Sequence, residues 1–410
     1  MIQFIHTADI HFGMENYGRV DPQTGIHSRL LDFDRALNSC IDTAIAQKVD
    51  FFLFCGDAYK TAHPSQTQQR LLIQCFFRLY DAKIPIVIIV GNHDHPLSFG
   101  KANALDLFGE FPLEGFHVIS KPTTIHLQTK NGPINIVGMP WPTRNSVALK
   151  QHEAASTNIT EYISKAACRI IADYAAKLDP EIPAVLAGHL TVSSGVFSGS
   201  EKRAVYGTDP LFMPSQLAIS PFDYVALGHL HRNQNLNKNG SIPIVYSGSI
   251  ERVDFGERKE PKGFCLVSIP KKGAATYEFI ETPTRPFIQI DVKLQSGISQ
   301  TKQMLDAIAK YSITDAVVKI MYHIPENEKD TVDLKIVQQA CSSAIHIVGI
   351  IPIRPITERI RRIASNQSSL SMEALLHNYF SEKKDVADKT KLLVSKAMEL
   401  LEEQDEQETC

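Results

Sequence analysis

Short apolar runs that end in glycine or a polar residue recur over the first 282 residues, and they constrain the fold more than any other feature of this chain. Each run holds mainly β-branched and aromatic residues over four to eight positions, which is typical of buried strands rather than helices. The runs are IQFIHTAD, DFFLFCGD, IPIVIIVGN, INIVGMP, PAVLAGH, YVALGH, IPIVYSGS and GFCLVSI. The series predicts a domain built around β-sheet.

Helical patterns separate the early strands. A helix is expected from Leu30 to Val49, where apolar residues recur at helical spacing. Another is expected from about Ser65 to Asp81, behind the turn signal Thr-Ala-His-Pro-Ser. Strands that alternate with helices predict a layered α/β domain. The later strands have few helices between them, which suggests a second sheet packed on the first.

The composition changes at ETPTRPF (281–287), where two prolines indicate a linker after a first domain of residues 1–282. Beyond the linker, FIQIDVKL, DAVVKIMY and IHIVGIIPI alternate with two helical stretches. This β-α-β-α-β pattern predicts a small α+β domain over residues 285–355. Two amphipathic helices are expected in a third segment, 365–410, which ends in the acidic, frayed run EEQDEQETC.

Composition excludes several classes of protein. A chain of 410 residues is too long for one ordinary hydrophobic core. Its net charge of −3 indicates no overall basic surface, so nucleic-acid binding would need a local basic patch, bound metals or a partner protein. The first residues resemble no secretion signal, and no apolar run reaches the ~20 residues that span a bilayer. The seven cysteines are scattered without a CxxC pair. We therefore expect a reduced, cytoplasmic protein.

The predicted strands end in residues that can bind metal ions. These ends are Asp9-x-His11, Gly56-Asp57, Gly91-Asn92-His93-Asp94, Gly188-His189 and Gly228-His229-Leu230-His231. Because ligand sites in open α/β sheets lie at the carboxyl ends of strands, the five ends should converge on one crevice. The glycines before the ligands would allow sharp turns and a close approach of the backbone.

Carboxylate, amide and imidazole ligands suit divalent Mn²⁺, Fe²⁺ or Zn²⁺, and the absence of thiolates argues against a structural zinc site. Two ions about 3.5–4 Å apart can bind a phosphodiester and activate a hydroxide for in-line attack. One carboxylate must bridge them, and Asp57 is the natural choice because it ends a central strand. Each motif alone has an ordinary structural explanation; the five in this order predict a binuclear site.

The order DxH…GD…GNHD…GH…GHxH resembles the calcineurin-like metallophosphoesterase superfamily and, within it, the SbcD nucleases. HTADIHFG, FLFCGDAYKTAHPSQTQQR, and GHLHRNQ with IVYSGSIERVDFGE carry the narrower resemblance, which spans roughly residues 1–270. The resemblance implies a layered α-β-β-α core, a small capping domain and C-terminal helices.

The resemblance also assigns the site. One metal would be bound by Asp9, His11, Asp57 and His231, and the other by Asp57, Asn92, His189 and His229. His93 would bind no metal and would instead stabilise charge at the phosphate or protonate the leaving oxygen. Asp94 would either orient His93 or be a purely structural carboxylate.

Some residues depart from this pattern. Archaeal relatives carry a second histidine three residues beyond the aspartate of the GD motif, where this chain has Lys60. Lys60 either contacts a phosphate or is solvated. The loop that contains Lys202 and Arg203 either faces the substrate or is a solvated insertion. The histidines without an assigned role are His6, expected in the core, His63 and His95.

The resembled family consists of Mn²⁺-dependent nucleases that act in DNA repair, recombination and replication, as 3′→5′ exonucleases on duplex ends and as endonucleases on single strands and hairpins. They work as dimers bound to SbcC, an ABC-type ATPase with a long coiled coil. The resemblance therefore implies a DNA substrate and two Mn²⁺, with Mg²⁺, Fe²⁺ or Zn²⁺ as alternatives. The capping domain would position DNA, and the tail helices would dock on SbcC or pack back on the capping domain.

Other functions on the same fold stay open. A phosphatase would use the same ligands but would not need a capping domain or docking helices. A cyclic-nucleotide phosphodiesterase would usually be shorter. A non-catalytic scaffold would be expected to have lost ligands, and this sequence keeps the full set.

Overall fold

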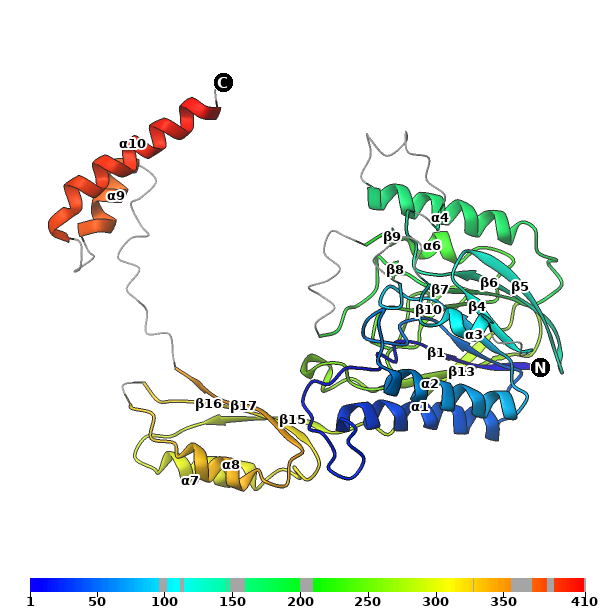
Figure 1. Ribbon diagram of the computed structural model, residues 1–410, viewed down its shortest axis with the longest axis horizontal. Helices are drawn as coiled ribbons and strands as arrows, with labels where there is room; N and C mark the ends of the chain where they lie inside the picture. The colour runs from blue at the N-terminus through cyan, green and yellow to red at the C-terminus, as the bar shows by residue number, and fades with distance from the viewer. Residues whose placement is uncertain are drawn as a thin grey trace. The chain divides into compact units, whose positions relative to one another are not determined.

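The computed structural model describes residues 1–95, 102–110, 114–144, 146–147, 159–199, 209–326, 328–354, 371–381 and 387–408 (Figure 1). Contacts divide the chain into two compact units. The larger unit comprises Met1–Ile324 and Lys329–Ile353, and the smaller one comprises Pro325–Glu328 and Arg354–Cys410.

Two six-stranded sheets form the centre of the larger unit. The first has the order β14 (Thr276–Glu281), β13 (Gly263–Ile269), β1 (Ile2–Thr7), β2 (Phe51–Phe54), β3 (Ile86–Ile89), β4 (Phe116–Ile119). The second has the order β11 (Gln234–Asn235), β12 (Ile244–Tyr246), β10 (Tyr224–Gly228), β7 (Ala184–His189), β6 (Gly132–Met139), β5 (Thr123–Thr129). Apolar side chains from both sheets, among them Phe4, Val87, Val185 and Ala226, form one buried cluster, as expected for sheets packed face to face.

Helices cover the outer faces of the two sheets. In the first sheet, Phe52 and Ile88 belong to the same buried cluster as residues of α1 (Ser28–Ala46) and α2 (Gln66–Asp81). In the second, Leu186 and Val225 pack with α4 (Ile159–Ala175). Figure 1 shows α4 and the pair α1 and α2 on opposite sides of the strands. The predicted layered α-β-β-α core is therefore confirmed.

Local signals set the helix boundaries. Ser65 caps α2 through a capping box with Gln68, so the predicted helix start at Ser65 lies one residue from the observed one. The prediction that the first helix continues to Val49 was wrong, because α1 ends at Ala46. Lys48 adopts φ 49°, a left-handed conformation that turns the chain out of the helix and into β2.

A separate three-stranded parallel sheet follows the linker, with β15 (Phe287–Lys293), β16 (Val317–His323) and β17 (His346–Ile353) in chain order. Helices α7 (Gln300–Ile308) and α8 (Leu334–Ala340) form the crossovers that parallel strands require and share one core with the sheet. Both helices are shorter than the stretches that the sequence predicts, near 298–311 and near 332–344. The smaller unit contains α9 (Met372–Ser381) and α10 (Thr390–Glu408), where two tail helices were expected. Across the described residues, no helix is long and apolar enough to cross a membrane.

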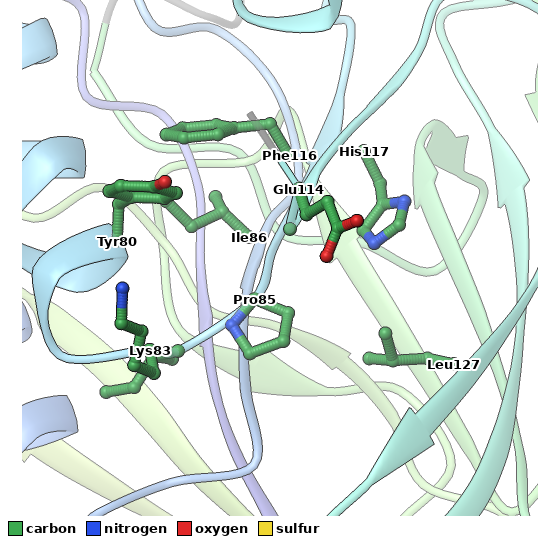
Figure 2. A pocket seen from close by; sticks show the side chains of 10 residues that line it. Tyr80, Lys83, Pro85, Ile86, Glu114, Phe116, His117 and Leu127 are labelled. Carbon is green, nitrogen blue, oxygen red and sulfur yellow. The ribbon is translucent and has the colours of Figure 1, made fainter. Parts of the chain in front are cut away.

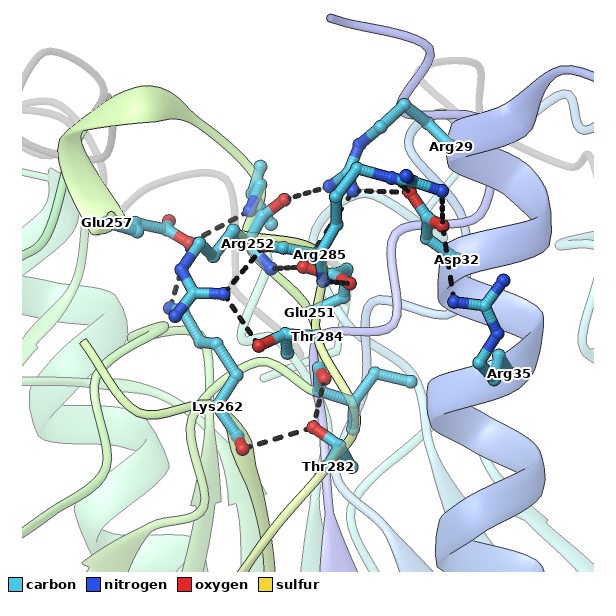
Figure 3. Close-up of polar contacts among 12 residues, drawn as sticks. Arg29, Asp32, Arg35, Glu251, Arg252, Glu257, Lys262, Thr282, Thr284 and Arg285 are labelled. Atoms are coloured by element: carbon cyan, nitrogen blue, oxygen red, sulfur yellow. Dashed lines mark hydrogen bonds and ion pairs between the residues drawn. The ribbon is translucent and has the colours of Figure 1, made fainter. Parts of the chain in front are cut away.

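A buried charge network joins α1 to the segment that leads into β15 (Figure 3). The Asp32 carboxylate accepts hydrogen bonds from Arg29 at 2.8 Å and from two nitrogens of Arg285 at 2.5 and 2.6 Å. The Arg29 guanidinium also lies over the ring of Phe287, at 5.2 Å. One buried carboxylate therefore compensates two arginines, and the network fixes the start of β15 against α1.

Asp32→Ala should strongly destabilise the protein, because it removes the nearest carboxylate from two largely buried guanidinium groups and leaves only the more distant Glu251, 3.8 Å from Arg29. We expect a loss of about 3–5 kcal/mol in the free energy of unfolding, measured by chemical denaturation. Asp42→Ala is the matched control, since the Asp42 side chain is 63% exposed and pairs with Arg78 at the surface, where ion pairs contribute little. Equal stability of the two variants would contradict the role given to Asp32.

Candidate metal centre

The parallel strands bring their carboxyl ends to one place. β1, β2 and β3 are parallel neighbours in the first sheet, as are β7 and β10 in the second. The turns that follow them are strained, since Asp9, His11, Asp57 and His229 have φ values of 54°, 52°, 59° and 101°. Non-glycine residues rarely adopt this region, and such strain is typical of functional sites. Backbone bonds hold the turns in place, from Asp9 N to Gly56 O at 2.9 Å and from His11 N to Asp57 O at 3.0 Å.

Glycine allows the close approach that was expected at these turns. A Cβ on Gly91 would overlap the Asp57 carboxylate, and one on Gly228 would overlap the carbonyl oxygen of Cys55. Any larger residue at either position would therefore push the strand ends apart.

The first predicted ligand set converges. The Nε2 atoms of His11 and His231 lie 3.0 Å apart, and His11 Nε2 lies 3.7 Å from Asp57 Oδ2. Ligand atoms of Asp9, His11 and His231 all lie within 4.8 Å of one another. The structure thus brings together the residues expected at one metal.

The second set converges beside the first. Asn92 Oδ1 lies 2.9 Å from His189 Nε2 and 3.1 Å from His229 Nδ1. His189 Nε2 is also 3.4 Å from Asp57 Oδ2. The same Asp57 oxygen therefore faces a histidine of each set, which is the position that a bridging carboxylate needs.

Three partners fix which nitrogen each histidine presents to the site. His189 Nδ1 contacts the carbonyl oxygen of Cys55 at 2.7 Å, and His231 Nδ1 contacts Glu257 at 2.9 Å. His229 Nε2 contacts Asp209 at 3.2 Å. A ring that donates through its outer nitrogen leaves a lone pair on the inner one. In the neutral rings, the lone pairs then face one another and the oxygens of Asn92 and Asp57. A cation bound between them would satisfy these acceptors, and so the residues fit divalent metals.

Burial and neighbouring charges shift the pKa values of the site in opposite directions. Burial raises the pKa of Asp9 to about 7. Burial alone would also raise the pKa of Asp57, but His189 and the other imidazoles around it hold this pKa well below the usual range. Burial would likewise lower the pKa of His189, yet the Asp57 carboxylate raises it to about 9. Asp57 is therefore the anion around which the imidazoles gather.

His93 lies at the open side of this cluster. Its side chain is exposed, its backbone N–H donates to Asp57 Oδ1 at 2.9 Å, and its Nδ1 contacts the carbonyl oxygen of Lys60 at 2.8 Å. A ring nitrogen of His93 also lies within 4.8 Å of ligand atoms of His11 and Asp57. The contact with Lys60 fixes the ring by its Nδ1 side and leaves Nε2 without a partner among the described residues.

Asp94 does not contact the ring of His93, contrary to one of the two roles considered for it. Its carboxylate is buried and accepts four backbone N–H groups, from Asp57, Ala58, Tyr59 and Gly91. Four bonds use the full acceptor capacity of a carboxylate. The structure therefore supports the structural role, in which Asp94 ties the turn after β2 to the turn after β3.

The remaining residues singled out in the sequence lie as follows. His6 is buried as expected, between the hydroxyl of Tyr224 at 3.1 Å and the carbonyl of Leu227 at 3.2 Å, and burial lowers its pKa to about 3. Lys60 and His63 are exposed, and His95 is half-buried. Lys202 and Arg203 lie outside the described residues.

Sequence reasoning missed the outer partners of the histidines. Glu257 belongs to η1 (Phe255–Glu257) and is the final residue of the motif IVYSGSIERVDFGE, so it could have been found there. Nothing near Asp209 in the sequence signals its contact with His229. The cavity of about 400 Å³ shown in Figure 2 lies elsewhere, lined by residues such as Tyr80, Lys83 and Phe116, and contains none of the predicted site residues.

Glu257→Gln should weaken one metal without removing the other. Glu257 contacts His231, and the buried ammonium of Lys262 lies 2.8 Å from its second oxygen, so loss of the charge disturbs only the set that contains His231. We expect roughly 10–100-fold lower affinity for one of two ions, measured by titration calorimetry with Mn²⁺. Glu260→Gln is the control, because Glu260 lies near the same lysine at 3.5 Å but has no contact with His231 in the structure. Equal loss at both ions would contradict this assignment.

Asp94→Asn should loosen both turns, because the amide group would face backbone N–H groups that now donate to a carboxylate oxygen. Each unsatisfied buried donor costs about 1–3 kcal/mol. We expect a lower unfolding temperature even in EDTA, together with weaker metal binding. His93→Asn, one residue away and exposed, should leave the unfolding temperature unchanged; the opposite ranking would refute the role of Asp94.

Residues 2–233 match the family described as calcineurin-like phosphoesterase. The chain is 28% identical over 335 residues to the SbcD subunit of the SbcCD nuclease from Staphylococcus saprophyticus, and the alignment covers 79% of this chain and 80% of that protein. This similarity confirms the predicted resemblance to the SbcD nucleases.

Solved structures give weaker similarities. A protein from Thermus thermophilus has a TM-score of 0.39 at 11% identity, and a dimetal phosphatase from Danio rerio has a TM-score of 0.38 at 10% identity. Each comparison covers 68% of this chain and 98% of the solved chain. The family is shown by the match over residues 2–233. The match spans more than half of the chain and includes every strand end that carries a predicted ligand, and so the chain belongs to the calcineurin-like phosphoesterase family of metal-binding hydrolases.

Proposed function

We propose that this chain is the Mn²⁺-dependent nuclease subunit of an SbcCD-type complex, which hydrolyses DNA phosphodiester bonds. It would act as a 3′→5′ exonuclease on duplex ends and as an endonuclease on single strands and hairpins. The observation that carries the proposal is the position of Asp57, shared between two ligand sets, with His93 exposed beside it. The similarity to the SbcD subunit from Staphylococcus saprophyticus, over 79% of the chain, supports DNA over other phosphoesters.

The residues of the chain divide the work. When bound, two divalent ions supply Lewis acidity that polarises the phosphodiester and lowers the pKa of a water molecule. Asp57 would help to hold both ions, and Glu257 and Asp209, which contact His231 and His229, would orient these two rings as ligands. Because His93 Nδ1 contacts the carbonyl oxygen of Lys60, its free Nε2 is the atom that would donate a proton to the leaving oxygen, which requires the imidazolium form.

The rest of the chain would serve the substrate and the partner. Residues 1–282 would form the nuclease domain, 285–355 the capping domain that positions DNA, and 365–410 the helical tail that docks on the SbcC coiled coil. Large apolar side chains that are more than half exposed support a docking role for the tail: Met372, Tyr379, Leu392 and Leu400. We further propose a homodimer within a heterotetramer that acts in DNA repair, recombination and replication. Six described cysteines are free thiols, which suits the reducing cytoplasm.

A metallophosphatase or phosphodiesterase that acts on another phosphoester is the alternative, because it would use the same ligands. The two are separated by comparing the cleavage of linear duplex DNA with that of a chromogenic phosphomonoester. A non-catalytic scaffold is disfavoured because the full ligand set converges.

The first experiment is cleavage of an end-labelled duplex with Mn²⁺, Mg²⁺ or EDTA. We expect Mn²⁺-dependent shortening from the 3′ ends by the wild type. His93→Asn should lose about 10²-fold or more of this activity yet still bind both ions, because general acid catalysis contributes about that much and no metal is lost. Asp57→Asn should lose metal as well as activity, measured by calorimetry.

Equal loss of metal in His93→Asn and Asp57→Asn would refute this division of roles. If the wild type cleaves no DNA under any metal, the assay is repeated with an SbcC-type partner. Failure with the partner, together with hydrolysis of the phosphomonoester, would replace the nuclease with the alternative.

A further inference from the structure

Trp141 is the only tryptophan of the chain, and it lies beside the second ligand set. The centroid of its ring is 5.0 Å from that of His229 and 6.1 Å from that of His189. It follows β6, whose carboxyl end neighbours that of β7 because the two strands are parallel. The indole therefore stands at the edge of the cluster where a phosphoester would bind.

The backbone of Trp141 is held firmly, whereas its side chain is only partly covered. Buried Pro140 and Pro142 flank it, and its N–H donates at 3.0 Å to the carbonyl of Val90, two residues before Asn92. The ring is half-buried and tilted by 37° against His229. Within the described ranges, the indole N–H has no hydrogen-bond partner. An indole that is held in place and partly exposed in a polar site offers a ring face on which a ligand can stack.

A nucleobase is the chemical group that fits this surface. Proteins that hold single-stranded nucleic acid stack bases on aromatic side chains, and every base offers a π-face for this contact. Simple phosphoesters offer none. The metal held by Asn92, His189 and His229 would bind the phosphate, and the base of the same nucleotide would then lie on the side of the indole.

We propose that Trp141 forms a base-stacking subsite next to the scissile phosphate, so that the centre selects phosphoesters that carry a nucleobase. This inference rests on the proposed nuclease function and names the feature of the substrate that the site reads. Stacking is tolerant of sequence, and so the subsite would select nucleotides without selecting a particular base.

The test uses the single tryptophan as a reporter. Full-length protein loaded with Mn²⁺ is titrated with dTMP and with deoxyribose 5-phosphate, which carries the same phosphate and sugar but no base. Only dTMP should quench the tryptophan fluorescence, and it should bind at least about tenfold more tightly than the sugar phosphate, as expected for one stacked base. Equal affinity for the two ligands, or no quenching by dTMP, would overturn the proposal.

Substitutions separate stacking from mere support of His229. By calorimetry, Trp141→Phe should keep most of the preference for dTMP, and Trp141→Leu should lose it while binding Mn²⁺ normally. Tyr80→Leu is the control, because Tyr80 is also half-buried but lines the cavity of Figure 2 and not the metal centre. Loss of Mn²⁺ affinity in Trp141→Leu would overturn the proposal by showing that the indole only holds a ligand.

Failure of this proposal is distinguishable from failure of the proposed function. Wild-type protein that cleaves duplex DNA but binds both small ligands equally would refute the subsite alone. Protein that prefers dTMP but cleaves no DNA, even with a partner, would refute the nuclease and leave the subsite as that of another nucleotide phosphoesterase.

Discussion

The Asp94 carboxylate holds together two strand ends on which the whole centre depends. It accepts the backbone N–H groups of Asp57, Ala58 and Tyr59 after β2 and that of Gly91 after β3. Since Asp57 faces both ligand sets and Asn92 follows Gly91, one buried side chain fixes the separation of the two sets. Asp9, His11 and Asp57 keep their strained φ values because hydrogen bonds hold each turn in this conformation.

Electrostatics at the centre follow from this geometry. Several imidazoles are buried around Asp57, and each outer nitrogen that contacts a carbonyl or carboxylate leaves the inner nitrogen facing its neighbours. Such a cluster is costly without positive charge at its middle, because buried polar groups need partners. The fold therefore provides a preorganised site for divalent cations rather than a general polar cleft.

One short segment, Glu251–Glu257, connects the centre to the parallel sheet of β15–β17. At one end, Glu251 accepts a hydrogen bond at 3.1 Å from the backbone N–H of Arg285, which leads into β15. Phe255 stacks on Phe287 of β15, with ring centroids 5.6 Å apart, and Glu257 orients His231. The segment Glu251–Glu257 thus contacts both the β15–β17 sheet and His231, a predicted metal ligand.

The sequence by itself determined the layered fold and which carboxylate, amide and imidazole residues end the strands, in their order; that these residues bind metal stays a prediction. It could do so because strand runs and the residues that end them are local patterns, and because parallel strands must bring their carboxyl ends together. Asp57 as the bridging residue follows from the same reasoning, although its role in metal binding stays a prediction.

Only the tertiary structure decided which groups hold the ligands. Each outer contact of a histidine joins residues that are far apart in the sequence: 134 residues for His189 and the Cys55 carbonyl, 20 for His229 and Asp209, and 26 for His231 and Glu257. The spacing of apolar residues along the chain does not predict such contacts. The sequence also does not predict the contacts of Asp94, because its partners are backbone N–H groups, which every residue type except proline carries. It does not predict the position of Trp141, because His189 and His229 come from other strands. Hydrogen bonds between distant turns depend on how the sheets pack, and this packing is what the sequence pattern leaves open.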